Sequence, residues 1–235
     1  MRIVTRAVAL GVLLAGLHCS GVALAQTLER GNGPEPSTLD PHRCPEVACA
    51  NILRDLFEGL VAEDGAGRLV PGVAERWEVS GDGRTWTFHL RPDARWSNGE
   101  PLDAPQVLAS LRRAFAPATA APFAGHLDAI ENASAVQRGL QPPENLGIAA
   151  PDPATLVFTL RRSADLPRLL TLPVAYPVYL PGLAEYGARH TRPGNLVSNG
   201  AYRLADWLPQ AQVTLESYPH FCEPPPIPRV RFHVT

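Results

Sequence analysis

The residues best suited to chemistry stand close together near the start of the chain, at His42, Cys44 and Cys49. Imidazole and thiolate side chains are the ligands that hold zinc, nickel or copper. Their spacing matches no established metal motif, so a loop histidine beside two small, partly buried cysteines is the favoured interpretation. If residues 44–49 are extended, five steps of about 3.3 Å place the cysteine Cα atoms beyond the roughly 7 Å that a disulfide allows. A Cys44–Cys49 disulfide therefore requires a turn.

Motifs that indicate catalysis are missing from the rest of the sequence. There is no G-x-S-x-G nucleophile elbow, no H-E-x-x-H metalloprotease motif, no phosphate-binding loop and no dinucleotide-binding loop. The seven histidines are scattered, and scattered histidines are far more often structural than catalytic. We therefore expect neither enzyme activity nor a cofactor.

The N-terminal segment has the composition of an export signal. Two arginines precede the uncharged apolar run from Ala7 to Leu17, which is shorter than the roughly 20 residues that span a membrane. Small residues end the segment at Ala25, so we predict that residues 1–25 are a signal peptide cleaved after Ala25. A lipid anchor on Cys19 is less favoured, because His18 stands where a small residue is preferred.

The charge and cysteine content of the remaining chain limit its partners and its compartment. Without the signal it carries 19 basic and 23 acidic residues, a formal charge of −4, which gives no basis for a nucleic-acid partner. No later run is apolar and long enough to cross a membrane. Cys44, Cys49 and Cys222 remain, an odd number, so we expect at least one free thiol. We expect a monomer in the periplasm.

Hydrophobic periodicity predicts a mixture of helices and strands. Helical spacing occurs over residues 52–60 and again after Asp103, where Gln106 completes a capping box. Alternation with a period of two, bounded by turn residues, predicts half-buried strands. These strands are Thr27–Arg30, Leu60–Ala62, Arg68–Val70, Trp77–Val79, Thr85–Leu90, Thr155–Leu160, Ala201–Leu204, Val213–Leu215 and Val230–Val234. The mixture indicates an α/β or α+β fold.

The last predicted strand, Val230–Val234, has nothing after it in the sequence to pair with or cover it. Strand edges of this kind are usually blunted or buried. We therefore expect that a partner segment is missing and that the chain is cut short.

Short motifs lie in a fixed order along the chain. They are S-T-L-D-P at residues 37–41, L-F-E-G-L at 56–60, P-G-V-A-E-R-W at 71–77, S-G-D-G-R-T-W-T-F-H-L-R at 80–91, W-S-N-G-E-P-L at 96–102 and V-S-N-G-A-Y-R-L-A-D-W at 197–207. In this order they closely resemble the extracytoplasmic solute-binding proteins of the peptide/nickel ABC-transporter family (family 5), particularly the oligopeptide-binding members. The resemblance covers residues 28–235. Its glycines and tryptophans suit turns and buried packing, so most of the signature is structural.

The resemblance implies a periplasmic-binding-protein-like α/β fold of class II, the large peptide-binding type, in which two lobes close over the ligand. It places residues 26–57 in the first lobe, residues 58–179 in a small inserted α+β domain, and residues 180–235 back in the first lobe. The second lobe would follow the crossover between lobes. We expect that this chain is truncated at that crossover.

The resemblance also implies which residues contact a ligand. Family members pair the peptide main chain with a strand-like segment, which corresponds here to Cys44 through Cys49, and Val47 matches a contacting valine. Pro45 replaces a contacting glutamate and lacks the backbone N–H. Phe123 stands where relatives carry a contacting tyrosine, although packing in the core explains it equally well. The acidic residue that holds the peptide's amino terminus lies in the missing lobe.

These features lead to one main hypothesis and two alternatives. The main hypothesis is a periplasmic receptor that captures oligopeptides and delivers them to the permease subunits of an ABC importer. The first alternative is a member of the same family that binds nickel or a metal chelate through His42, Cys44 and Cys49. The second is a truncated remnant that captures nothing.

Overall fold

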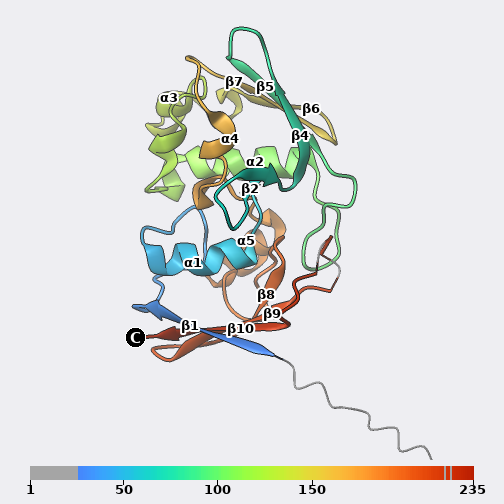
Figure 1. Ribbon diagram of the computed structural model, residues 1–235. Helices are drawn as coiled ribbons and strands as arrows, with labels where there is room; N and C mark the ends of the chain where they lie inside the picture. Colours follow the sequence, from blue (N-terminus) through green and yellow to red (C-terminus); the bar gives the residue numbers. More distant parts are fainter. Residues whose placement is uncertain (1–25, 220, 223) are drawn as a thin grey trace, which may run out of the picture.

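Strands from both ends of the described chain form the first of two four-stranded sheets (Figure 1). The computed structural model describes residues 26–219, 221–222 and 224–235, so the predicted signal peptide at residues 1–25 lies outside the described residues. The strand order is β1 (Thr27–Gly33), β10 (Arg229–Val234), β9 (Gln212–Ser217) and β8 (Tyr202–Leu208). β1 and β10 are parallel, whereas the other neighbours are antiparallel.

The last strand of the chain, β10, is an inner strand of this sheet. It pairs with β9 on one side and with β1 on the other. Its apolar residues Val230 and Phe232 are only 2% and 1% exposed. The expectation that this strand lacks a partner is wrong, because both partners precede it in the sequence and β1 lies at the opposite end of the described chain.

One helix, α1 (Val47–Leu56), packs against the first sheet. Ile52, Leu53 and Leu56 are fully buried, and their spacing of one, three and four residues places them on one face of the helix. The sheet side chains that they meet are Tyr202, Leu204, Val213, Leu215, Val230 and Phe232. The helix predicted over residues 52–60 therefore exists, but it begins earlier and ends at Leu56, where Phe57 is already extended at φ −126°.

The second sheet is antiparallel throughout. Its order is β4 (Ala74–Val79), β5 (Thr85–Leu90), β7 (Thr155–Thr159) and β6 (Ile148–Asp152). Phe88 and Phe158 meet edge to face at 5.4 Å in its core. This sheet lies at the opposite end of the molecule from β1 and β10 (Figure 1).

The longest helix of the described residues, α2 (Ala104–Phe115), covers the second sheet and begins with the predicted capping box. The Asp103 carboxylate accepts a hydrogen bond from the Gln106 backbone N–H at 2.9 Å, and the Gln106 side chain accepts one from the Asp103 N–H. The same Gln106 oxygen accepts a hydrogen bond from the Trp96 indole at 2.9 Å. The prediction is confirmed, and the box also fixes a fully buried tryptophan.

The remaining elements are short. They are the β2–β3 hairpin (Val61–Glu63, Leu69–Pro71), the α-helices α3 (Ala133–Gln137), α4 (Leu166–Leu169) and α5 (Leu180–Tyr186), and the 3-10 turns η1 (Pro117–Thr119), η2 (Ala124–Leu127), η3 (Pro143–Asn145), η4 (Pro173–Ala175) and η5 (Gly187–Arg189). Within the described ranges, no helix is long and apolar enough to cross a membrane.

The described chain has two hydrophobic cores. One is built from residues between 60 and 175, around the second sheet and α2. The other is built from residues 39–57, Tyr176 and residues 202–232, around the first sheet and α1. The chain thus leaves the first core after α1, builds the second, and returns to complete the first.

Candidate functional site

An apolar groove lies at the junction of the two cores, beside the start of α1. Three segments that are far apart in the sequence line it, namely residues 44–54, residues 123–126 and residues 172–174. Its volume is about 280 Å³. The polar groups along it are Glu46, Arg54 and His126. Apolar walls with a few polar groups are typical of a pocket for a small molecule or a peptide side chain.

Cys44 and Cys49 form a disulfide at one wall of the groove, with Cα atoms 5.9 Å apart. The turn that the disulfide requires is supplied by α1, which begins at Val47 and advances about 1.5 Å per residue instead of the 3.3 Å of a strand. The expectation of a strand-like segment from Cys44 to Cys49 is therefore wrong from Val47 onward. Both sulfur atoms are in the disulfide, so neither is a thiolate. Cys222 is exposed elsewhere on the surface.

Three of the four predicted ligand contacts line this groove. Val47 is 73% exposed at the first position of α1, and Phe123 is 41% exposed, so Phe123 lies at the surface and not in the core. Cys44 contributes to the same wall. Cys49 does not line the groove, because it is fully buried in the core beneath α1.

The sequence-based prediction missed several residues that line the groove. Arg54 stands seven residues after Val47, on the same helical face, so helical spacing could have revealed it. His126 follows Phe123 by one turn, and the two rings lie 5.7 Å apart. The third wall, formed by Leu172, Pro173 and Val174, has no signal in the sequence, because only the tertiary structure brings it beside α1.

His42 lies outside the groove, and both of its ring nitrogens have partners. The Nε2 atom is 2.9 Å from the Tyr176 carbonyl oxygen, so Nε2 carries the proton and donates. The Nδ1 atom then accepts a hydrogen bond from Arg113 Nη1 at 2.8 Å. Burial and the positive charge of Arg113 lower the pKa of His42 to about 4. The structure gives no support to the metal alternative at His42, Cys44 and Cys49, because the sulfur atoms form a disulfide and both ring nitrogens have hydrogen-bond partners.

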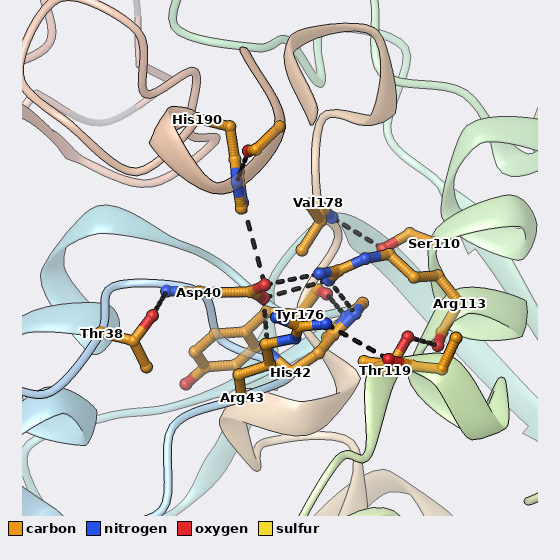
Figure 2. Close-up of polar contacts among 12 residues, drawn as sticks. Thr38, Asp40, His42, Arg43, Ser110, Arg113, Thr119, Tyr176, Val178 and His190 are labelled. Atoms are coloured by element: carbon orange, nitrogen blue, oxygen red, sulfur yellow. Dashed lines mark hydrogen bonds and ion pairs between the residues drawn. The ribbon is translucent and has the colours of Figure 1, made fainter. Parts of the chain in front are cut away.

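Asp40, from the S-T-L-D-P motif, joins the two cores through an ion pair with Arg113 (Figure 2). The two guanidinium nitrogens reach the two carboxylate oxygens at 3.0 and 2.5 Å. Asp40 lies just before α1 in the sequence, whereas Arg113 lies in the last turn of α2. The Asp40 and Arg113 side chains are only 4% and 13% exposed. This contact fixes the segment that leads into the groove relative to the second core.

The charges around Asp40 favour a structural role for the cluster. Burial opposes ionisation of Asp40, but the hydrogen bonds and charge of Arg113 outweigh burial and hold its pKa below the usual value. His190 approaches with Nε2 3.9 Å from the same carboxylate, and burial lowers the pKa of His190 as well. Asp40 is therefore charged at neutral pH while His42 and His190 are neutral. The Asp40–His42 pair is not arranged for acid–base catalysis, because both nitrogens of His42 already have partners.

A second cavity, of about 250 Å³, shares Arg54 with the groove. Glu58 lines it, and Arg91 Nη2 lies 2.8 Å from a Glu58 carboxylate oxygen. Burial raises the pKa of Glu58 to about 7 despite Arg91. The Asn199 side chain donates to the Glu58 carbonyl at 2.8 Å. Residues of three motifs, L-F-E-G-L, F-H-L-R and S-N-G-A-Y, thus meet at this junction.

Solved structures of known proteins share the fold of this chain. The Haemophilus influenzae OppA in complex with the peptide RPPGFSPFR superposes with a TM-score of 0.86 at 36% identity, over 90% of this chain and 42% of that chain. The fold therefore defines a lobe of a periplasmic binding protein, and the predicted fold class is confirmed.

The family follows from the sequence comparisons. The profile of the bacterial extracellular solute-binding proteins, family 5 (middle part), matches residues 68–235, and the chain belongs to this family. It is 42% identical over 220 residues to the periplasmic oligopeptide-binding protein OppA of Escherichia coli K12, covering 89% of this chain and 39% of that protein. It is 38% identical over 203 residues to a probable deoxycholate-binding periplasmic protein of the same organism, covering 85% of this chain and 38% of that protein. The chain thus spans about two fifths of the length of these relatives.

Proposed function

We propose that this chain supplies the first lobe and the inserted small domain of a receptor that captures oligopeptides for an ABC importer. In this proposal residues 26–57 and 180–235 form the lobe, and residues 58–179 form the inserted domain. The two hydrophobic cores support this division, since each is built almost entirely from one of these sets. The receptor works by binding and release, without a catalytic step or a cofactor.

The groove carries the proposal. It brings the apolar side chains of Val47, which is 73% exposed, and Phe123, which is 41% exposed, to one junction between the cores. Exposed apolar side chains in a concave site gain free energy when a ligand covers them. Pro45 provides no backbone N–H, and the chain becomes helical at Val47, so we propose that side-chain packing contributes more than main-chain pairing on this wall.

The proposed compartment and partners follow from this role. We propose export on residues 1–25 with cleavage after Ala25, a periplasmic monomer, and delivery of peptide to the permease subunits in the inner membrane. The relatives named above are periplasmic proteins, which supports the compartment. N-terminal sequencing of the secreted protein tests the cleavage site, and a first residue other than Gln26 would contradict it.

Peptide binding is tested on this 235-residue chain. Calorimetry with a pool of apolar tri- to pentapeptides measures the binding, and thermal unfolding supports it. A peptide present at 100 times its Kd is expected to stabilise the folded protein by about 2.7 kcal/mol. Val47→Asp is expected to weaken binding at least about tenfold, because it introduces a charge where an apolar side chain is covered.

Val79→Asp is the matched control, because Val79 is also an exposed valine, 46% accessible, but lies in β4 away from the groove. This control is expected to bind peptide like the wild type. Equal affinity of the wild type and Val47→Asp would contradict the groove as the peptide site. The absence of any binding heat or thermal shift would contradict peptide capture itself.

A second candidate ligand is an amphipathic steroid. The mostly apolar walls of the groove favour it, and one relative is a probable deoxycholate-binding protein. The same calorimetric titration with deoxycholate, below its micelle concentration, separates the two ligands. Tighter binding of deoxycholate than of every peptide in the pool would favour the steroid.

A further inference from the structure

The first turn of α1, which presents Val47 to the groove, lacks the usual stabilisation of a helix N-terminus. Its N-cap residue is Glu46, which makes no side-chain capping hydrogen bond. The Glu46 carboxylate instead accepts hydrogen bonds from the Ser37 backbone N–H and hydroxyl, both at 2.9 Å. The first turn also contains no acidic residue that would interact favourably with the helix dipole.

The Cys44–Cys49 disulfide spans this uncapped turn. It connects a residue before the helix with the third residue inside it, and Val47 lies within the ring that it closes. Cys49 is anchored because it is fully buried in the core beneath α1. The disulfide therefore holds in place the backbone that an N-cap side chain would otherwise hold.

One hydrogen bond and one restricted backbone angle further fix the segment that enters this ring. Arg43, just before Cys44, donates a hydrogen bond to the Ala118 carbonyl at 3.2 Å, on the 3-10 turn η1 of the other core. Pro45, inside the ring, has its φ angle restricted by its own side chain. Arg43 and Pro45 thus restrain the chain before Val47, and the buried Cys49 restrains it after Val47. This wall of the groove is therefore ordered before a ligand binds.

We propose that the Cys44–Cys49 disulfide positions the first turn of α1 for ligand binding, so that Cys44 and Cys49 determine affinity although Cys49 does not touch the ligand. This inference rests on the proposed capture of peptides with apolar side chains. Binding to a pre-ordered surface avoids the loss of conformational entropy that a flexible surface suffers. Without the disulfide, the uncapped turn frays, and Val47 must be ordered again each time a peptide binds.

The test is the double variant Cys44→Ala/Cys49→Ala of this chain. Alanine is chosen because it leaves no buried hydroxyl or thiol at either position. Its affinity for the peptide Ala-Leu-Phe-Ala is expected to fall at least about tenfold, because the backbone of about one further residue must be ordered on binding. Faster dissociation is expected to account for most of this loss. Amide hydrogen exchange of residues 46–50 is expected to be faster in the unliganded double variant than in the wild type.

Val213→Ala is the control, because Val213 lies in the same core but in β9, away from the disulfide. It lowers global stability and is expected to leave affinity and the exchange of residues 46–50 unchanged. Wild-type affinity and wild-type exchange in the double variant would overturn the positioning role, as would an equal loss of affinity in Val213→Ala. If the wild type binds neither this peptide nor any peptide of the pool, the proposed function fails, whereas the exchange measurement still decides whether the disulfide orders the turn.

Discussion

At the scale of single residues, the polar groups of the first core act in combination. Asp40 is ionised because Arg113 compensates for its burial, and His42 is neutral because Arg113 and burial both oppose its protonation. One guanidinium thus sets the charge of two neighbours. The three side chains form a junction between the cores, and that junction lies directly before the groove-forming segment of α1.

Replacement of Arg113 by alanine is expected to destabilise the protein by about 3–5 kcal/mol, because it leaves the Asp40 carboxylate buried and without its ion-pair partner. Urea unfolding of the full-length protein measures this change. Arg76→Ala is the control, since Arg76 is 60% exposed and lies 3.9 Å from Glu75; its cost is expected to be at most about 1 kcal/mol. Similar stability losses for the two variants would show that the Asp40–Arg113 pair has no special role.

The depressed pKa of His42 makes stability depend on pH. The unfolded chain binds a proton at His42 below pH 6.5, whereas the folded protein does so only below about pH 4. The unfolded state therefore holds more protons in this window, and stability is lost as the pH falls from 6.5 to 4. The expected loss from His42 is roughly 3 kcal/mol.

Other groups titrate in the same window, so the measurement compares the wild type with His42→Gln. Burial lowers the pKa of His190, which adds a loss in the same direction. The raised pKa of Glu58 acts in the opposite direction between pH 4.5 and 7. His42→Gln is expected to show a smaller decrease in stability than the wild type between pH 6.5 and 4. Parallel stability curves for the two proteins would contradict the assignment of this proton to His42.

At the scale of secondary-structure elements, the end of α1 meets the loop before β8 at very short range. The Gly200 N–H donates a hydrogen bond to the Leu56 carbonyl at 2.8 Å. A Cβ atom at Gly200 would lie 2.6 Å from the Leu56 carbonyl carbon and 2.7 Å from the Phe57 nitrogen. Only glycine allows the S-N-G-A-Y motif to approach the helix end this closely.

Gly200→Ala is expected to destabilise the protein by about 1–3 kcal/mol, because the contacted atoms are backbone and cannot move aside as a side chain would. Thermal unfolding measures the effect. Gly65→Ala is the matched control, since a Cβ atom there meets nothing within 4 Å. If both alanines cost the same, the short approach at Gly200 does not limit packing.

At the scale of the whole molecule, the groove lies where the two separately packed cores contact each other. The junction carries specific polar contacts, including Asp40–Arg113, His42–Tyr176 and Glu58–Asn199. Polar contacts of this kind fix orientation strictly, because a small displacement breaks them. The relative position of Val47 on one side and Phe123 on the other is therefore set by residues that line neither wall.

The sequence by itself determined the local elements and the family. Period-two alternation located most strands of both sheets but missed β6 at Ile148–Asp152, and the Asp103–Gln106 box predicted the start of α2, because these signals depend only on neighbouring residues. The ordered motifs indicated the solute-binding family, and the match to the family profile confirms it.

Only the tertiary structure decided which distant segments meet. Nothing local indicates that β1 pairs with β10, that Leu172 lies beside Val47, or that His42 binds a carbonyl and a guanidinium. The disulfide is also a contact that the structure decided, because Cys44 and Cys49 come within bonding distance only when the chain becomes helical at Val47. Periodicity reports which face of an element is apolar, whereas the partner of that face is chosen by packing across the whole chain.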